Sequence, residues 1–380
     1  MKTEYSVVND ATVVSPLTID AFVRSVAISS GRPLSFLLGA GASLSSGMPS
    51  AERCIWEWKR DIFVSNNPSL KDAVGELSLP GTRSRIQSWL DLRGDFPVAG
   101  CETEYSFYAQ ECYPITSSRR SFFQKYVQKA IPHIGYRLLP LLVKANLLRT
   151  VWTTNFDTLP ARACAAANVI AVEIGCDCSH RTMRPPAKGE LRIVSLHGDF
   201  RYDSLKNTEA ELQEQEAGLK AALLEDLRQS DLVVLGYSGR DHSLMSLLEK
   251  AYLSPGQTRL YWCGYGDQPS ESVKKLLNGA HTCGREVFYI DTEGFDDVIT
   301  RLALRCLNNE YLQEAKTILE SSGRLQYAKK LFTILPLEPT ALFKSNAYPV
   351  QFPKEVLQAK LRFSGGRQKK QLARPEACRL

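Results

Sequence analysis

The sequence predicts an α/β protein built on a parallel β-sheet with helices on its faces. Short apolar runs recur along the chain, and most are continuous rather than alternating, which is typical of strands buried on both faces. Helical patterns lie between many of these runs, as they do when crossover helices connect parallel strands. Polar clusters follow four of the runs directly.

Seven segments have the length and composition of buried strands. In chain order they are residues 34–38, 149–153, 169–174, 192–196, 232–235, 259–263 and 287–290. Helical periodicity is predicted over 121–144, over 208–229 and from Phe295 onward. The apolar residues expected on one face of the second helix are Leu212, Leu219, Leu223 and Leu227. The third helix holds Val298, Leu302, Leu304 and Leu307.

Domain boundaries follow from where these patterns stop. Residues 1–300 form the predicted body, and within it 53–146 lacks a convincing strand, so we expect a largely helical insertion there. Residues 301–353 are expected to form a helical and extended C-terminal region for assembly. Residues 354–380 form a basic tail, with little order expected after Phe363.

The net charge of +6 is concentrated in that tail. Residues 354–380 hold eight basic and two acidic residues, so the rest of the chain is neutral. A body without excess positive charge excludes a protein that coats nucleic acid over its whole surface. The tail itself is either an arm that contacts a partner or nucleic acid, or a disordered solubilising end.

Neither insertion into a membrane nor secretion into an oxidising compartment is expected. No run of 18 apolar residues exists, and the start of the chain lacks the apolar stretch of a signal peptide. The ten cysteines include no CxxC pair, and the closest two are Cys176 and Cys178. Reduced thiols and a cytoplasmic location are therefore expected.

The first predicted strand runs into a glycine-rich turn over residues 39–50. Glycine lets a backbone approach a ligand closely, and Ser43, Ser45 or Ser46 can cap the helix that follows. A helix N-terminus in this place attracts anions such as phosphate. Leu44 stands where the dinucleotide fingerprint needs a third glycine, and the lysine of a P-loop is missing. A purely structural turn is the alternative interpretation.

Three further polar clusters follow predicted strands. Their residues are Thr154, Asn155 and Asp157; His197, Gly198 and Asp199; and Gly236, Tyr237, Ser238 and Asp241. Each cluster also has a purely structural interpretation. Asn155 and Asp157 can cap a helix, His197 can be an interior histidine with its hydrogen bonds satisfied, and the cluster at Gly236 can be another strand-to-helix turn. The carboxyl ends of parallel strands meet at one edge of a sheet, which is where open α/β sheets bind ligands. Four clusters at that edge favour a ligand site.

These motifs, in this order, resemble those of the sirtuin, or SIR2, family over roughly residues 30–295. Gly39-Ala40-Gly41-Ala42-Ser43 with Ser46-Gly47-Met48-Pro49 resembles the family's NAD-binding loop. Thr154-Asn155-Phe156-Asp157 is similar to its T-Q-N-[IY]-D motif, and His197-Gly198 to the pair that carries its catalytic histidine. Gly236-Tyr237-Ser238 resembles the turn that meets the cofactor ribose. The resemblance implies a Rossmann-like NAD-binding domain.

Two departures separate the chain from the protein deacetylases of that family. Pro49 is followed by Ser50-Ala51-Glu52 rather than Asp-Phe-Arg, and the next cysteine after His197 is Cys263, without a nearby partner. No structural zinc is therefore expected. This combination resembles the divergent SIR2-like domains of prokaryotic antiphage systems, which consume NAD. Such domains assemble with a HerA-type ATPase, with a short Argonaute, or with further copies of themselves.

The resemblance implies an NAD+ glycohydrolase that acts as the NAD-depleting effector of an antiphage complex. The expected catalytic residues are Asn155, which orients the attacking water, His197, which takes a proton, and Asp157, which fixes Asn155 or the ribose. The expected NAD-binding residues are Gly39, Ala40, Gly41, Ala42, Ser43, Gly47, Thr154, Gly236, Tyr237, Ser238 and Asp241. The expected partners are NAD+, further copies of the chain, and an ATPase of HerA type or a short Argonaute.

Two other functions fit the same motifs. One is a protein deacylase or ADP-ribosyltransferase, against which the missing zinc cysteines argue. The other is a non-catalytic module that senses NAD or ADP-ribose, against which the presence of both Asn155 and His197 argues. The acidic run Glu209, Glu211, Glu214 and Glu216 has irregular helical spacing and is interpreted as a solvated helix face rather than a metal site.

Overall fold

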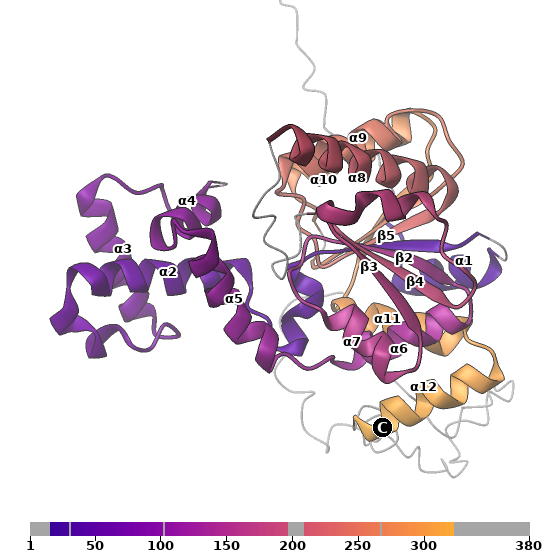
Figure 1. Ribbon diagram of the computed structural model, residues 1–380, viewed down its shortest axis with the longest axis horizontal. Coiled ribbons are helices and arrows are strands. Elements are labelled where there is room, and N and C mark those ends of the chain that lie inside the picture. Colours follow the sequence, from indigo (N-terminus) through magenta and orange to yellow (C-terminus); the bar gives the residue numbers. More distant parts are fainter. Residues whose placement is uncertain (1–15, 30–31, 102, 197–208, 267, 323–380) are drawn as a thin grey trace, which may run out of the picture. The chain divides into compact units, whose positions relative to one another are not determined.

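The computed structural model describes residues 16–29, 32–101, 103–196, 209–266 and 268–322 (Figure 1). The chain divides into two units, Met1–Ala315 and Lys316–Leu380, and the architecture below is that of the first. Helix α12 (Asn309–Ser321) spans the boundary. The basic tail 354–380 lies outside the described residues.

A seven-stranded parallel sheet forms the centre of the first unit, with the strand order β3-β4-β2-β1-β5-β6-β7 (Figure 1). Its strands are β1 (Leu34–Leu38), β2 (Leu148–Thr153), β3 (Ile170–Ile174), β4 (Glu190–Ser195), β5 (Asp231–Leu235), β6 (Leu260–Gly264) and β7 (Val287–Asp291). Every pairing between neighbours is parallel. The predicted Rossmann-like α/β fold is confirmed, and each predicted strand is present within two residues of its expected ends.

The chain reverses its direction of winding at β1. From β1 it crosses to β2 on one side, and it later returns to β5 on the other side of β1. Every residue of β1 and β5 is buried, which is the reason that their sequences are continuous apolar runs. The crevice beyond the carboxyl ends of such neighbouring strands is the usual ligand position in open α/β sheets.

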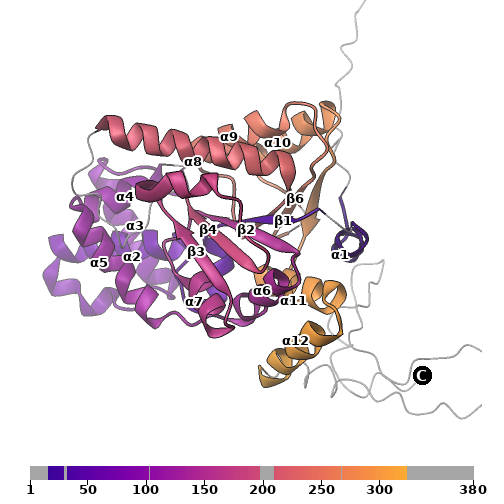
Figure 2. The same cartoon turned by 45° about the vertical axis from the view of Figure 1, so that its right-hand side comes forward.

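Helices cover the sheet on two opposite sides (Figures 1 and 2). One layer contains α8 (Glu209–Gln229), α9 (His242–Tyr252) and α10 (Glu271–Thr282). The other contains α6 (Ile134–Lys144), α7 (Leu159–Ala166) and α11 (Phe295–Cys306). Helix α1 (Ile19–Ile28) packs beside α11. Helices α8, α9 and α10 connect the consecutive strands from β4 to β7, whereas the second layer combines α6 and α7, which precede β3, with α11, which follows β7.

Two of the predicted helices pack largely as expected. In α8, Leu219, Leu223 and Leu227 recur at every fourth position and are buried against the sheet, while the side chain of Leu212 lies outside the described residues. In α11, Val298 and Leu302 are buried. Leu304 is 39% exposed, because two further residues rotate it away from the face that Leu302 shares with the core.

The single helix expected over 121–144 is wrong, because the structure has two helices there. Helix α5 (Thr116–Lys129) ends before Pro132, and α6 begins at Ile134. Proline has no N–H to donate and disfavours the helical conformation of the residue before it. The N–H of Ile131, freed from a helix, donates instead to the carbonyl of Ser46 at 3.0 Å.

The segment between β1 and β2 is helical, and no strand occurs among its described residues. Helices α2 (Ala51–Asn66), α3 (Pro80–Arg93), α4 (Glu104–Cys112) and α5 lie together (Figure 1), and they pack around a hydrophobic cluster of their own. Short turns cover Pro68–Leu70 and Asp72–Val74. The buried members of the cluster are Cys54, Ile55, Trp58, Phe63, Val74, Ile86, Leu90, Tyr108 and Phe122.

A buried cation lies within this helical cluster. Lys59 is 1% exposed, forms an ion pair with Glu104, and donates to Oε1 of Gln87 at 2.8 Å. Its Nζ also lies 4.7 Å from the ring centroid of Trp56. A buried ammonium needs such partners, since an unpaired charge away from water is strongly unfavourable.

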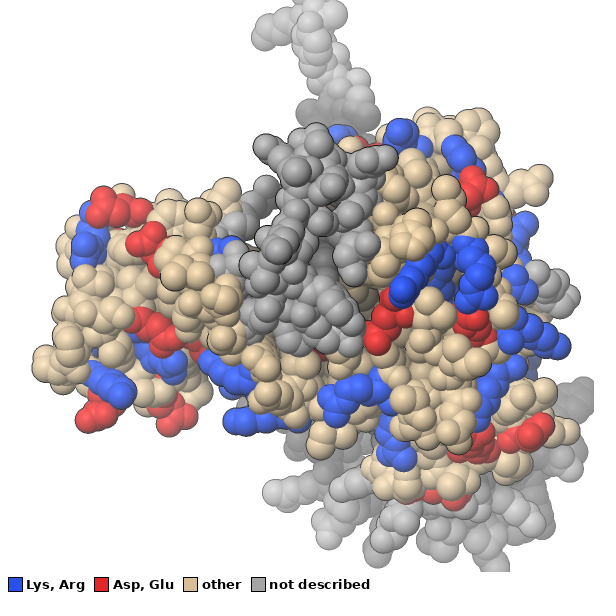
Figure 3. Space-filling model, in the orientation of Figure 1, with Lys and Arg blue, Asp and Glu red and all other residues tan. Residues whose placement is uncertain are grey.

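The charged side chains of the surface are of both signs. On the face shown in Figure 3, acidic and basic residues are interspersed over the part that the structure describes. This distribution agrees with the balanced charge of the chain before residue 354. In the described ranges, no helix combines the length and apolar character that crossing a bilayer requires.

Candidate functional site

Three of the four polar clusters meet at the carboxyl edge of the sheet. The glycine turn follows β1, the segment 154–158 follows β2, and the turn at Gly236 follows β5. These strands are adjacent in the sheet, so their ends converge. The fourth cluster begins with His197, which lies outside the described residues.

The glycine turn packs directly on the turn at Gly236. The N–H of Gly39 donates to the carbonyl of Leu235 at 3.0 Å, and the N–H of Gly41 donates to that of Gly236 at 2.8 Å. A Cβ on Gly39 would lie 2.5 Å from the oxygen of Gly236. Conversely, a Cβ on Gly236 would lie 2.2 Å from the nitrogen of Ala42. Contact between the two turns therefore accounts for these glycines before any ligand is considered.

A short 3-10 helix, η1 (Ala40–Ser46), continues from this turn. Ala40 is exposed, whereas Ala42 and Ser43 are buried. Gly47 ends the helix in the left-handed conformation, with φ of +97°. The backbone at the start of the turn is therefore accessible to solvent, whereas the side chain of Ser43 is buried in the protein.

Asn155 is held against the glycine turn through its side-chain amide. Its Nδ2 donates to the carbonyl of Gly39 at 3.0 Å and to Oγ of Ser43 at 3.0 Å. Its backbone N–H donates to Oγ1 of Thr153 at 3.0 Å, and the N–H of Thr154 donates to the carbonyl of Leu38 at 3.1 Å. Both amide hydrogens of Asn155 are used, so its Oδ1 is the atom left to accept a hydrogen bond from a water or a substrate hydroxyl.

Asp157 is joined to the same serine. Its Oδ2 accepts from Oγ of Ser43 at 2.6 Å, and its Oδ1 accepts from the N–H of Leu159 at 3.1 Å. Burial raises the pKa of the Asp157 carboxyl, and the hydrogen bonds from Ser43 and Leu159 oppose that rise. The geometry links Asp157 to Asn155 through Ser43.

Tyr136 of α6 completes the cluster, and no sequence pattern identified it. Its hydroxyl lies 2.8 Å from Oγ of Ser43, and its side chain is fully buried. Burial raises the pKa of Tyr136 well above its ordinary value, and the nearby carboxyl of Asp157 raises it further. The available signal was a tyrosine in a helix that is mostly apolar, since a buried hydroxyl requires a polar partner.

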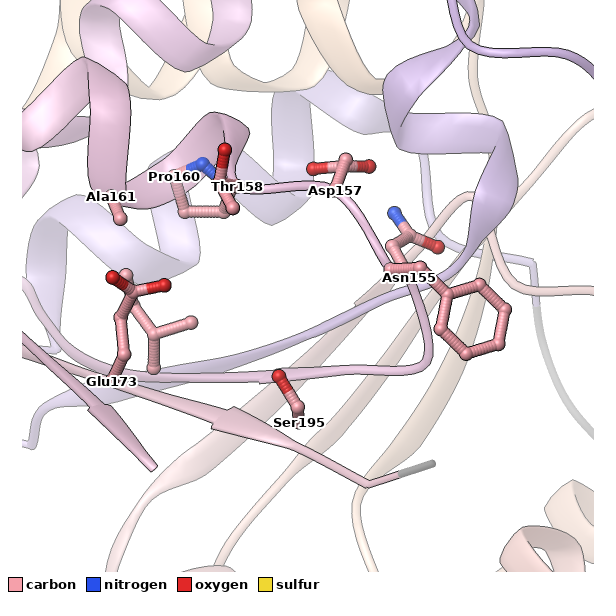
Figure 4. Close-up of a pocket in the computed structure, with 9 residues that line it drawn as sticks. Asn155, Asp157, Thr158, Pro160, Ala161, Glu173 and Ser195 are labelled. Carbon is pink, nitrogen blue, oxygen red and sulfur yellow. The ribbon is translucent and has the colours of Figure 1, made fainter. Parts of the chain in front are cut away.

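A small pocket adjoins the segment 155–158 (Figure 4). It is lined by Asn155, Phe156, Asp157, Thr158, Pro160, Ala161, Glu173, Ile193 and Ser195. In Figure 4 the hydroxyl of Ser195 and the carboxylate of Glu173 face the space below this segment. The side chains of Asn155 and Asp157 extend from its other side, toward Ser43.

Glu173 of β3 and Ser195 of β4 were missed at the level of sequence. Both lie near the carboxyl ends of their strands, beside the loop that carries Asn155. The signal for Glu173 was a carboxylate inside an apolar run, in a strand that proves to be partly buried at the edge of the sheet. Ser195 precedes His197 by two residues in the sequence, and His197 itself lies outside the described residues.

The turn after β5 has clear structural roles as well. The ring of Tyr237 lies 5.9 Å from that of Trp262, and Ser238 is exposed while its carbonyl accepts from Oγ of Ser270 at 3.2 Å. Asp241 caps α9 by accepting from the N–H of Leu244 at 3.1 Å. Contact of Tyr237, Ser238 and Asp241 with a nucleotide remains a prediction.

No metal centre emerges from the residues that the structure describes. Among them, no group of three or more histidine, cysteine, aspartate or glutamate side chains is arranged to hold an ion. The described part of the edge offers an oriented amide, a buried carboxyl and hydroxyl groups.

Comparison with known proteins gives one family. Residues 149–283 match the family model of the SIR2-like domain, a stretch that contains β2 from its second residue, Asn155, Asp157 and the turn at Gly236. No curated protein matches the chain. The match supports a SIR2-like domain and NAD as its ligand. The glycine turn lies before the matched residues and is joined to them through the bonds of Asn155 and Ser43.

Proposed function

We propose that this chain, with its SIR2-like domain, is an NAD+ glycohydrolase that releases nicotinamide and ADP-ribose. The observation that carries the proposal is the anchoring of Asn155. Its amide is locked onto Gly39 and Ser43 beside a pocket at the carboxyl edge of the sheet, so its oxygen has one fixed direction. A hydrogen-bond acceptor in a fixed position can hold the attacking water in the correct orientation. The entropy cost of orienting that water is then met on binding rather than in the reaction step.

The proposed reaction breaks the bond between C1′ of the ribose and the nicotinamide nitrogen. The bonding electrons leave with nicotinamide, which departs as a neutral molecule from a cationic substrate. The oxygen of a water forms the new bond to C1′, and one proton is lost from that water. Asn155 accepts a hydrogen bond from the water through Oδ1 and so directs the water's lone pair at C1′.

His197 is the proposed acceptor of the proton. Imidazole has an ordinary pKa near 6.5, which suits transfer from water or from a ribose hydroxyl at neutral pH. The proposal for this residue rests on the sequence motif and on its position two residues after Ser195 of the pocket. Asp157 acts indirectly, since its carboxylate holds the serine to which Asn155 donates.

The sequence after His197 favours hydrolysis of NAD+ over a reaction that modifies a protein substrate. The two CxxC pairs that hold zinc in protein deacylases are missing from the sequence. A deacylase or an ADP-ribosyltransferase would release nicotinamide only when an acceptor peptide is added. A sensor would bind NAD+ and leave it intact after long incubation.

The proposed biological role is depletion of NAD+ as the effector of an antiphage complex. The partners proposed are further copies of the chain, an ATPase of HerA type or a short Argonaute.

A toxic NADase must stay inactive until its complex has assembled. The helices between β1 and β2 can transmit such control, because α5 contacts the segment that carries Asn155. The ring of Phe123 in α5 lies 5.5 Å from that of Phe156, which stands between Asn155 and Asp157. Mass measurement of the chain, alone and with the product of its neighbouring gene, tests the assembly.

The enzymatic proposal is tested with Asn155→Ala and His197→Ala. The purified chain and its assembly are incubated with NAD+ in the absence of any peptide, and nicotinamide and ADP-ribose are quantified by chromatography. Each substitution is expected to lower the rate by about 10²- to 10⁴-fold, which is the usual contribution of an orienting or proton-accepting group.

The matched control is Asn66→Ala. Asn66 is exposed at the end of α2, where its side chain donates to the backbone carbonyl of Ile62 and accepts from the guanidinium of Arg93, both away from the site. Its removal is expected to leave the rate unchanged. Wild-type turnover by a folded Asn155→Ala or His197→Ala protein would contradict the assignment, as would intact NAD+ after prolonged incubation with the assembled wild-type complex.

A further inference from the structure

The hydroxyl of Ser43 has three partners at hydrogen-bond distance. Oδ2 of Asp157 lies at 2.6 Å, the hydroxyl oxygen of Tyr136 at 2.8 Å and Nδ2 of Asn155 at 3.0 Å. The serine itself is 1% exposed, so water does not compete for these positions. Residues separated by about a hundred positions in the chain therefore meet on one oxygen atom.

Counting hydrogens assigns a direction to each of these bonds. Ser43 has one hydroxyl hydrogen, and it donates this to Asp157. Nδ2 of Asn155 is only a donor, so Ser43 accepts from it. Tyr136 must then donate to Ser43, since the serine has no second hydrogen. Burial raises the pKa of Tyr136, which keeps that donor protonated at neutral pH.

The packing of α6 sets the position of the tyrosine hydroxyl independently of the site. The ring of Tyr136 lies 4.7 Å from that of Phe295 in α11. The N–H of Gly135 donates to Oδ1 of Asp296 at 2.7 Å, and a Cβ on Gly135 would lie 2.7 Å from the Phe295 ring. The two helices therefore meet closely at Gly135, the residue next to the tyrosine.

We propose that Tyr136 is a positioning residue for the site. Its hydroxyl holds Ser43 in the rotamer that accepts from Asn155 and donates to Asp157, and through the serine it orients the amide of Asn155. Tyr136 contacts neither the water nor NAD+ in this assignment. The predicted effect of Tyr136 on turnover rests on the proposed NAD+ hydrolysis. Its predicted effect on the orientation of Asn155 is independent of that proposed function.

Tyr136→Phe removes the hydroxyl and keeps the ring that packs on Phe295. Ser43 then loses one of its three partners and is held by Asp157 and Asn155 alone, so the acceptor of the Asn155 amide is less firmly fixed. We expect kcat for NAD+ hydrolysis to fall roughly 10-fold, with KM within about twofold of the wild type, because misplaced groups cost chemistry more than binding.

A matched control is available in the same protein. The hydroxyl of Tyr261 lies 3.0 Å from Oγ of Ser25, and Tyr261 is likewise buried, near the amino end of β6. Tyr261→Phe deletes the same type of bond away from the site, so kcat should stay within about twofold of the wild type. A double-mutant cycle gives the mechanism: in a Ser43→Ala background, Tyr136→Phe should lower kcat no further.

A second measurement tests the orientation without catalysis. The side-chain NH₂ signals of Asn155 in an amide NMR spectrum are identified by their absence in Asn155→Ala. Tyr136→Phe should shift these signals and speed their exchange with water, while Tyr261→Phe should leave them in place. The inference would be overturned if the Asn155 signals do not move in Tyr136→Phe. It would also be overturned if Tyr136→Phe lowers kcat in the Ser43→Ala background by as much as it does in the wild type. Absence of NAD+ hydrolysis by the wild type would refute the proposed function instead, and the NMR result would still decide the role of Tyr136.

Discussion

At the scale of single residues, the site combines a buried carboxyl with the groups that hold it. Asp157 accepts from Ser43 and from the N–H of Leu159, yet burial still raises its pKa above the ordinary value of 3.8. Two hydrogen bonds thus do not fully replace the water that the ionised group loses. A carboxyl kept at some cost in stability is typical of a functional position.

Asp157→Asn should stabilise the fold at neutral pH, and the gain should shrink in acid. A carboxyl with a raised folded pKa binds its proton more tightly in the native than in the unfolded protein. The wild type therefore becomes more stable as the pH falls from above the folded pKa of Asp157 toward 3.8, whereas the asparagine variant lacks this increase. Free energies of unfolding from urea titrations between pH 4 and pH 7.5 measure the difference.

The control for that experiment is Asp72→Asn, which removes one negative charge from an exposed turn. A stability difference between wild type and Asp157→Asn that widens as the pH falls would contradict the raised pKa of Asp157.

At the scale of elements, the contact between two turns decides the shape of the edge. The turns after β1 and β5 interlock through Gly39, Gly41 and Gly236. Gly236 has φ of +65°, which side chains other than glycine adopt at a cost, and its missing Cβ makes room for the backbone of Ala42. The serine and asparagine of the site depend on this arrangement, because Asn155 donates to the carbonyl of Gly39.

Gly236→Ala should destabilise the protein by roughly 2–4 kcal/mol. Left-handed strain and displacement of the η1 backbone both contribute, and backbone cannot move aside as a flexible side chain can. Urea unfolding at pH 7 measures the effect.

Gly81→Ala serves as the comparison for that substitution. Gly81 lies in the first turn of α3 with no atom near the position of a Cβ, so alanine there should change stability by less than about 1 kcal/mol, in the favourable direction. Equal effects of the two substitutions would show that the contact between the turns does not hold the edge together.

At the scale of the whole molecule, the segment between β1 and β2 carries a core separate from that of the sheet. Helices α2–α5 enclose their own aromatic cluster and the buried pair of Lys59 and Glu104. Elements with separate cores can open separately, because few contacts couple their unfolding. Such a segment is suited to respond to a partner while the sheet stays intact.

Glu104→Ala should open α2–α5 and leave the sheet folded. The substitution leaves the ammonium of Lys59 buried without its carboxylate, which typically costs about 3–5 kcal/mol. Hydrogen exchange followed by mass spectrometry should show faster exchange across 51–129 and unchanged protection in β1, β2 and β5.

Glu52→Ala is the matched control, since Glu52 forms a solvent-exposed pair with Arg83. Exposed pairs contribute at most about 1 kcal/mol, so exchange should not change. Faster exchange in the central strands of Glu104→Ala would refute the independence of the two cores.

The sequence alone was sufficient for the sheet and for part of the edge. All seven strands were predicted because their apolar runs are visible locally, and in central strands such as β1 and β5 burial on both faces makes those runs continuous. The helix over 121–144 was predicted wrongly, because its apolar periodicity continues on both sides of Pro132 and outweighed the proline. The positions of Ser43, Asn155 and Asp157 at the carboxyl edge followed from their places after strands.

Only the tertiary structure decided which of these side chains meet. Ser43 bonds residues 93, 112 and 114 positions away, and Tyr136 among them belongs to a helix with no motif. Glu173 and Ser195 join the pocket because β3 and β4 are placed beyond β2 in the sheet order. Apolar periodicity and turn chemistry are local properties that a sequence displays directly. Hydrogen bonds between distant segments depend on strand order and helix packing, which arise only when the whole chain has folded.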